Sequence, residues 1–441
     1  MKKEFQSNRI AYEEATGAVC GETAFREDPS KVIVRARRLV RKDILRLAWP
    51  AILEMLLHTF IWILDTAMVG RLGAVALSAV GLGGQVYYTM AFILGGIATG
   101  TSAMVARHTG AGRHERAGSI GSQALFLAVL LGVLMGAAVF FTGGHIYRLA
   151  GMEARVARLG SQYVRIISLG SLFLLVNFVG NGILRGSGNT RAPLYVAAIA
   201  NGINAIGDYL LIFGVAGFPR LGVVGAAIAT LIAQITGGIA SIYYLTRGNS
   251  KVRVHRAKMV SLDTRTLKTL IALSVPASLE ELLLNGARTV GTFFIGALGT
   301  KAFAANQVAI AAESLSFMPG YGFAVAAGIL VGQRLGAGKP DEAREAGWQG
   351  TRLAVLVMGT IGLAFLLVPH YIIRLFTSDS EVAALGALAL RIAAFEQVAI
   401  GISEILAGSL RGAGDTRTPL YITGASSWLL RIPALYLAIY V

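Results

Sequence analysis

Two aspartates stand inside stretches of the sequence that are otherwise strongly apolar. Asp65 lies five residues before Gly70, and Asp208 lies six residues before Gly214. A charge inside a bilayer is costly unless it is paired or hydrated, so acids in such segments usually bind protons, ions or substrates. Two buried carboxyls that meet can share a proton and exchange it for a sodium ion or an organic cation.

Amide side chains accompany the aspartates at the spacing of one helical turn. Asn204 precedes Asp208 by four residues, and Asn177 precedes Asn181 by four, so each pair shares one helix face. Amide oxygens are neutral ligands that suit a hard cation such as sodium. The sequence therefore predicts a proton- or cation-binding site at Asp65, Asp208, Asn204, Asn181 and Asn177, with a possible sodium ion at Asp65, Asp208 and Asn204. The alternative that both aspartates only cap or bridge helices stays open.

A second group of ionisable residues predicts a cleft for a cationic substrate. The candidates are Glu281, Glu313, Glu396, Glu404 and His58. His58 shares a helix stripe with Asp65 and can relay protons, or it is a packed and hydrogen-bonded histidine. Arg288 lies two helical turns after Glu281, which favours an ion pair between them, and Arg431 is expected to pair with one of the acids. Hydrated helix ends or local pairs remain the alternative for the other glutamates.

The elements that must position these residues are membrane-spanning helices. The chain of 441 residues is 55% hydrophobic and 15% charged, whereas about a quarter of a soluble chain is charged. A helix of about 20 mostly apolar residues crosses a bilayer, and the runs lack the alternation of barrel strands. We predict an all-α polytopic protein with eleven spans, at about 47–69, 76–106, 119–141, 162–184, 192–214, 221–245, 268–297, 303–333, 349–369, 385–409 and 418–441.

The chain contains an internal duplication. LRGSGNTRAPLY at 184–195 and LRGAGDTRTPLY at 410–421 agree at nine of twelve positions. The two copies lie 226 residues apart. This shift, called here the repeat offset, also places Pro50 on Pro276 and Glu54 on Glu280. Two parallel units of six helices are an architecture of alternating-access transporters. The sixth helix, at 221–245, has no counterpart before residue 441. The second unit is therefore expected to be incomplete, either because the sequence is a fragment or because the protein lacks its last helix.

The duplication separates shared features from unique ones. The repeat offset places Gly291 opposite Asp65 and Ala434 opposite Asp208, so neither aspartate is repeated. A feature that breaks an internal symmetry is the better functional candidate. Glu54 and Glu280 are repeated one turn after a proline, which favours a shared structural role, such as bonding to backbone groups that the proline leaves free.

The distribution of charge predicts the orientation in the membrane. The net charge is +16, but Lys and Arg concentrate in the loops that face inward if the N-terminus is cytoplasmic, as the positive-inside rule requires. We therefore expect no nucleic-acid partner and an inner (plasma) membrane location. The predicted parts are a cytoplasmic basic tail (1–45), an N-lobe (46–246), a cytoplasmic linker (247–266) and an incomplete C-lobe (267–441). Residues 31–46 alternate apolar and basic side chains and are expected to lie on the anionic inner leaflet. The alternative, which the sequence favours, is a tail that only sets the topology.

Several phrases of the chain resemble the multidrug and toxic compound extrusion (MATE) family over residues from about 45 to the end. They are DTAMVGRLG (65–73), NGILRGSGNTRAPL (181–194), NAIGDYLLIFG (204–214), VGQRLGAGKPDEA (331–343) and LRIPALYL (430–437). An aspartate in the first helix with the Asn-x-x-x-Asp of the fifth resembles the DinF-like branch. The resemblance implies two six-helix lobes, a central cleft, and export of organic cations in exchange for protons or sodium ions. The missing twelfth helix departs from the family pattern.

Other functions predict different residues. A flippase for lipid-linked oligosaccharide needs several Lys or Arg facing the cleft to bind a pyrophosphate, whereas the deep charges here are mostly acidic. An intramembrane aspartyl protease lacks its Gly-x-Gly-Asp pattern, since position 205 is Ala205. A passive channel or scaffold leaves the buried acids unexplained. With one cysteine, Cys20, there is no disulfide framework or thiolate metal site. We expect a monomeric antiporter without an enzymatic cofactor, in which two lobes rock about the cleft.

Overall fold

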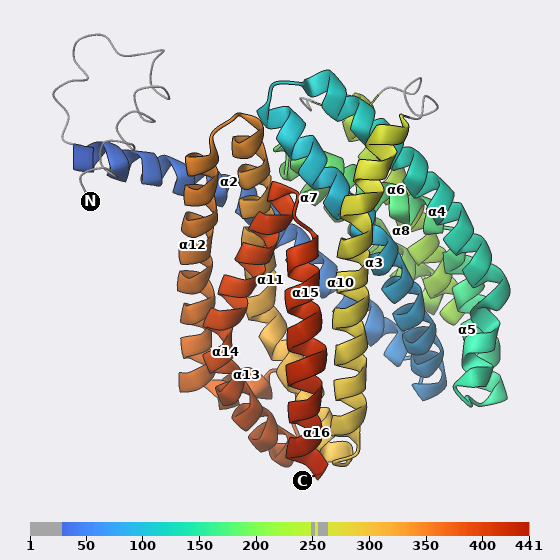
Figure 1. Ribbon diagram of the computed structural model, residues 1–441. Helices are drawn as coiled ribbons and strands as arrows, with labels where there is room; N and C mark the ends of the chain where they lie inside the picture. The colour runs from blue at the N-terminus through green and yellow to red at the C-terminus, as the bar shows by residue number, and fades with distance from the viewer. Residues whose placement is uncertain (1–28, 248–251, 255–262, 441) are drawn as a thin grey trace.

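The computed structural model describes residues 29–247, 252–254 and 263–440, and every regular element within them is a helix (Figure 1). Part of the predicted basic tail, including Cys20, and part of the predicted linker lie outside the described residues. The first half of the chain forms α2 (Pro29–Gly70), α3 (Ala74–Gly110), α4 (His114–Leu149), α5 (Ala154–Ser168), α6 (Ser171–Gly186), α7 (Arg191–Phe213) and α8 (Val223–Thr246).

The second half repeats the order of long helices. It forms α10 (Thr264–Gly296), α11 (Thr300–Gly336), α12 (Pro340–Leu367), α13 (Pro369–Arg374) and α14 (Ser380–Ala413). The final predicted span is continuous but not uniform, because α15 (Arg417–Gly424) and α16 (Ile432–Tyr440) flank a π-helical stretch, η2 (Ala425–Arg431).

The helices match the predicted spans in order. Within the described residues, nine helices are long and apolar enough to cross a membrane, and the bent pair α5 and α6 makes a tenth. The remaining predicted span is α10, whose 33 residues suffice in length but which carries several charged side chains. Because α10 packs against α3 and α15, it lies within the bundle as the repeat requires.

The predicted fourth span, 162–184, is two helices rather than one. The axes of α5 and α6 differ by 52° across the break at residues 169–170. A Cβ atom at Gly170 would lie 1.9 Å from Gln234 Oε1, so the side chain of α8 fills the space at the bend. Tyr87 Oη donates a hydrogen bond to the carbonyl of Ile167, 3.1 Å away. This hydrogen bond satisfies a backbone carbonyl at the break, which a membrane-embedded chain requires.

Equivalent helices make equivalent contacts in the two halves. α3 packs on α4 and α6, as α11 packs on α12 and α14, and α2 packs on α7 as α10 packs on α15. The halves meet where α2 contacts α11 and α10 contacts α3, which are the same contact after exchange of the repeats, and where α3 meets α11. The structure therefore carries the duplication into three dimensions.

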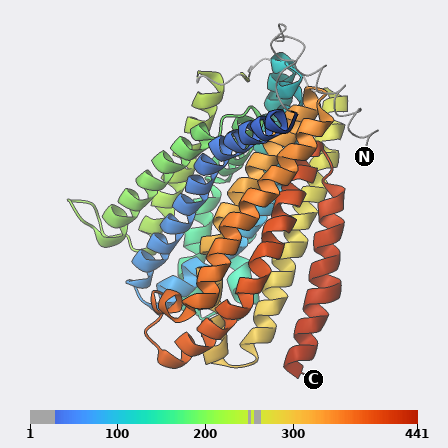
Figure 2. The same cartoon turned by 90° about the vertical axis from the view of Figure 1, so that its left-hand side faces the viewer.

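Helix α2 belongs to the cores of both halves. Its residues Ile44, Leu47 and Ala48 are buried in a cluster with residues of α11, α12 and α14. Met68 and Val69, near its other end, are buried in a cluster of first-half helices. Figure 2 shows α2 passing diagonally across one face of the bundle. The helix begins at Pro29 rather than near residue 47, so the first predicted span is only the later part of a helix of 42 residues.

The repeated phrase forms the same tight turn twice. Gly188 and Gly414 have φ angles of +86° and +90°, a conformation that glycine adopts without strain. After each glycine a side chain caps the next helix, since Asn189 Oδ1 accepts from Ala192 N at 3.1 Å and Asp415 Oδ1 accepts from Thr418 N at 3.0 Å. The phrase therefore recurs because each half needs this turn between its fourth and fifth spans.

We predict that Asp415→Ala lowers the free energy of unfolding by roughly 1 kcal/mol, the typical contribution of a helix cap. Hydrogen bonds from Thr418 hold the pKa of Asp415 below its usual value. The stabilisation is thus complete above the unfolded-state pKa and disappears as the pH falls through the lower folded-state value. Asp415→Asn, which copies the first repeat, is the control and should retain the cap. Thermal unfolding in detergent at pH 7 and at low pH measures the difference, and an equal loss in both variants would contradict the cap.

Candidate functional site

The two unrepeated aspartates meet in the first half of the bundle. Asp65 is on α2 and Asp208 on α7, and their carboxyl groups are within hydrogen-bonding contact. Asp208 is 1% exposed, and Asn204, one turn earlier, donates from Nδ2 to Asp208 Oδ2 at 3.1 Å. Asp65 Oδ1 and Asp208 Oδ1 are both buried without a hydrogen-bond donor. Two negative carboxylates repel strongly at this separation, so the arrangement suits a shared proton or a bound cation.

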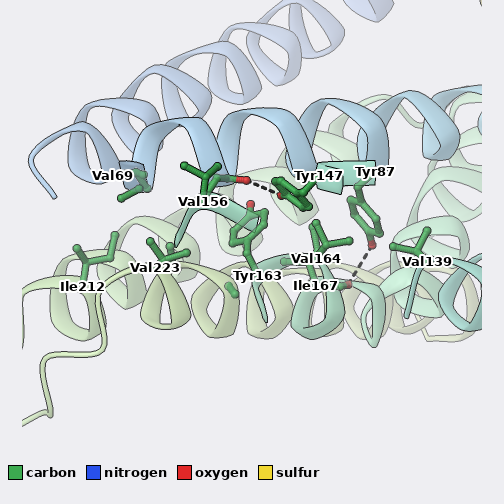
Figure 3. Packing of buried hydrophobic residues seen from close by; sticks show 14 of the residues in the cluster. Val69, Tyr87, Val139, Tyr147, Val156, Tyr163, Val164, Ile167, Ile212 and Val223 are labelled. Carbon is green, nitrogen blue, oxygen red and sulfur yellow. Dashed lines mark hydrogen bonds between the residues drawn. The ribbon is translucent and has the colours of Figure 1, made fainter. Parts of the chain in front are cut away.

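Tyrosines that the sequence analysis overlooked surround the aspartate pair. Tyr88 of α3 and Tyr163 of α5 both lie close enough to interact electrostatically with the two aspartates. Tyr163 also lies near Thr230, and Tyr88 near Gln234, both on α8. Figure 3 shows Tyr163 between Val223 and Val164 of this core, with Tyr147 near it and Tyr87 beyond Val164. Hydroxyl groups within apolar spans were the available signal, because such groups need partners in a membrane.

The two asparagines of α6 form no hydrogen bond with the aspartate pair among the described residues. Asn181 is 5% exposed, and the Oδ1 atoms of Asn177 and Asn181 are buried without a donor. Asn177 Nδ2 lies 3.1 Å from the place where a Cβ of Gly237 would stand, so it faces α8. Of the five predicted residues, the structure brings together Asp65, Asp208 and Asn204.

The predicted acids of the second half form two groups. Glu281 and Glu404 both interact electrostatically with Arg411 and with Glu280. Glu313 interacts with Glu396 and with Arg431. These residues come from α10, α11, α14 and η2, which pack together.

Two of the expected partners differ from the sequence prediction. Among the described residues, Arg288 and Glu281 form no direct ion pair, although the Arg288 charge still acts on Glu281. The Arg288 guanidinium lies 5.9 Å from the centre of the Phe317 ring. Asn285 Nδ2 donates to Glu281 Oε2 at 3.3 Å. His58 lies near Glu54 and Arg185 rather than in contact with the aspartates.

Glu54 and Glu280 each bind an arginine, not free backbone as the nearby prolines suggested. Arg185 Nη2 lies 2.5 Å from Glu54 Oε1, and Arg411 Nη2 lies 2.6 Å from Glu280 Oε1. The partners are 131 residues apart in both cases, so the repeat preserves the pair. A buried carboxylate needs a cationic partner more than a backbone group does. These arginines are those of the repeated Leu-Arg-Gly phrase.

The two halves touch closely at the end of the bundle that carries the repeated phrase. A Cβ at Gly110 would lie 1.9 Å from the carbonyl oxygen of Gln333, and one at Gly336 would lie 1.9 Å from that of Arg107. Gly110 and Gly336 are equivalent in the repeat, as are Arg107 and Gln333. The backbones of α3 and α11 therefore meet around the symmetry axis with no room for a side chain.

Groups of three or more His, Cys, Asp or Glu side chains able to hold a metal ion do not occur among the described residues. Any sodium ion at the aspartate pair would need oxygens from Asn204, hydroxyl groups or water as well. The hydroxyl groups of Tyr88 and Tyr163 are oxygens of this kind near the aspartate pair.

Known proteins resemble this chain in both sequence and fold. The family model MatE matches residues 50–210 and again 276–437. The chain is 31% identical over 401 residues to a probable multidrug resistance protein NorM of Thermotoga maritima, covering 91% of this chain and 86% of that protein. Multidrug resistance protein NorM of Burkholderia vietnamiensis is 30% identical over 405 residues, covering 89% and 86%. A crystal structure of MATE in complex with MaL6 has the same fold, with a TM-score of 0.85, 24% identity and coverage of 91% and 89%.

Proposed function

We propose that this chain, which belongs to the MATE family of membrane transporters, is a secondary active antiporter. It exports organic cations in exchange for protons or sodium ions. The family is one of transporters rather than enzymes, and two of the relatives above are named as multidrug resistance proteins. We place it in the inner membrane as a monomer with its N-terminus in the cytoplasm. Assignment to the DinF-like branch stays a prediction.

The observation that carries the proposal is the contact between Asp65 and Asp208. The two carboxyls come from helices α2 and α7, are largely shielded from solvent, and have only one hydrogen-bonded amide partner among the described residues, Asn204, for Asp208. A proton or a sodium ion that enters between them removes the repulsion, and its departure restores it. Asn181 and Asn177 take part in the proposal only as more distant polar groups.

Helix α2 is suited to transmit this change to the second half. Its Asp65 end packs with the first half, whereas its Ile44–Ala48 end packs in the core of the second half. A change in charge at Asp65 that alters the packing of α2 on α7 therefore alters the relation of the two halves. Coupling requires that the cation bind the inward-open and outward-open states with different affinities.

The acids of the second half support a cationic substrate. We assign Glu281, Glu313, Glu396 and Glu404 to the substrate cleft, and His58 to its inner border. The basic side chains Arg185 and Arg411 are already paired with Glu54 and Glu280. The remaining deep charges are therefore mostly negative, which disfavours the alternative of a flippase for a lipid-linked pyrophosphate.

The test is transport in proteoliposomes. We expect efflux of ethidium under a proton gradient or a sodium gradient, and the effective gradient identifies the coupling ion. Asp208→Asn should lose the gradient-driven efflux because Asp65 then has no second carboxylate beside it, so binding of a proton or cation no longer relieves a repulsion. Asp341→Asn, on an exposed position at the start of α12, is the control and should transport normally. Transport by Asp208→Asn at the rate of the unaltered protein would refute the assignment of the site.

A further inference from the structure

The first turns of α2 present an exposed basic face. Arg38, Lys42, Arg46 and Trp49 follow at intervals of four, four and three residues, so they share one stripe of the helix. All four are exposed, and the exposed fraction of Trp49 is 42%. Among the described residues, no acidic side chain forms an ion pair with the three basic ones.

A different face of the same helix is the one that binds the protein. Arg37 Nε lies 3.1 Å from Glu345 Oε1, and Arg41 Nε donates to Gln349 Oε1 at 2.6 Å. Ile44 and Ala48, on that side, are fully buried. The stripe therefore does not anchor α2 to α12 and is free to face the surroundings.

The stripe has the composition of a headgroup site. Leu39, Leu45 and Leu53 flank it and are 58%, 47% and 43% exposed. The Arg191 guanidinium, at the start of α7, lies 5.7 Å from the centre of the Trp49 ring, so a further cation reaches the same place. Tryptophan and arginine or lysine with leucine beneath them are typical of the interface between headgroups and hydrocarbon.

The direction of α2 keeps the stripe near one depth. From Arg38 to Trp49 a helix advances by roughly 16 Å, which exceeds the headgroup layer of about 6 Å if the helix stands upright. Figure 1 shows the first turns of α2 inclined steeply to α12 and α10 and extending sideways beyond α12. An inclined helix brings Arg38, Lys42 and Arg46 toward the same layer.

The repeat provides an internal comparison. The repeat offset places Thr264, Ala272 and Val275 opposite Arg38, Arg46 and Trp49, and only Lys268 repeats Lys42. The start of α10 has the same predicted orientation as the start of α2 and so needs cytoplasmic Lys or Arg as well. It nevertheless lacks the row of basic residues and tryptophan found on α2. The stripe therefore serves something besides membrane orientation.

We propose that the Arg38–Lys42–Arg46–Trp49 face of α2, with Arg191, binds the headgroup of an anionic phospholipid. The phosphate pairs with the guanidinium and ammonium groups, while the acyl chains lie against Leu45 and Leu53. The occupied site would hold the first turns of α2 in the headgroup layer while the other face binds α12. The inference does not depend on the coupling ion or on the transported cation.

Native mass spectrometry of the full chain in detergent tests the proposal with phosphatidylglycerol and phosphatidylcholine of identical acyl chains. We expect tighter binding of phosphatidylglycerol. Arg38→Gln/Arg46→Gln should weaken that binding by about fivefold for each charge removed, the usual contribution of a basic residue near an anionic surface. The matched control is Arg265→Gln/Lys268→Gln at the start of α10, which removes the same charge from exposed positions and should bind normally.

Three results would overturn the proposal. They are no preference for phosphatidylglycerol in the unaltered protein, unchanged binding by Arg38→Gln/Arg46→Gln, and an equal loss in the α10 control. Arg38→Lys/Arg46→Lys keeps the charge and should retain most of the preference. If the double glutamine variant does not fold, Lys42→Gln alone carries the test, with an expected loss of about fivefold.

Discussion

Replacing Gly110 with alanine is expected to hold the two halves of the transporter apart at the end where α3 meets α11. A Cβ there would stand 1.9 Å from the carbonyl oxygen of Gln333. That oxygen is part of a helix backbone, so it cannot turn aside as a side chain can. Overpacking of this kind usually costs about 1–3 kcal/mol. States in which this end is closed lose that stability, whereas states in which it is open do not.

Transport by alternating access needs both kinds of state. We therefore expect Gly110→Ala to slow export of ethidium by roughly 5-fold to 150-fold, which is the population shift that 1–3 kcal/mol produces. Gly336→Ala should act in the same way, because its Cβ would stand 1.9 Å from the carbonyl oxygen of Arg107. Gly84→Ala is the control on α3, since nothing lies within 4 Å of the added Cβ.

Spin labels can report the separation directly. Ala111 and Ala337 are exposed, equivalent in the repeat, and follow the two glycines. Labels at these positions, with Cys20 replaced by serine, should give a longer distance in Gly110→Ala than in Gly84→Ala. Equal distances together with normal transport would show that this contact does not have to close.

Much of the helix arrangement was predictable from the sequence because it depends on composition and repetition. Hydrophobic length predicts the spans, and the repeat offset relates the two halves. The meeting of Asp65 and Asp208 was also accessible, since both lie a few residues before a glycine at the end of an outward-running span. The residues that surround the pair were not, because Tyr88 and Tyr163 read as ordinary members of apolar helices.

The missed features depend on contacts between distant segments. The side chain that packs at the break between α5 and α6 is that of Gln234, which lies on α8 beyond α6 and α7, and no local pattern reports it. Glu54 was assigned to backbone near Pro50 because its partner lies 131 residues away. A usable signal existed, since Arg185 and Glu54 are both repeated at the same offset, and residues that are duplicated together are candidates for contact.

Separating the partners of a duplicated ion pair should give the largest loss of stability. Glu54 is 1% exposed and Arg185 is 17% exposed, so each charge depends on the other for compensation. Removing one partner of a buried pair costs about 3–5 kcal/mol, since a buried charge is left alone. We expect Glu54→Gln to lower the free energy of unfolding by that amount. Glu280→Gln should do nearly the same, because Arg411 and Glu280 are 23% and 7% exposed.

Two comparisons separate the pair from a general effect of substitution. Glu54→Gln/Arg185→Gln removes both charges and should be more stable than Glu54→Gln, since no lone charge remains. Glu381→Gln breaks the Lys301–Glu381 pair, whose side chains are 61% and 64% exposed, and should cost at most about 1 kcal/mol. Thermal unfolding in detergent measures all three variants. A double variant less stable than Glu54→Gln would mean that Arg185 stabilises the fold through another partner. The Glu54–Arg185 ion pair between α2 and α6 would then not explain the loss in Glu54→Gln.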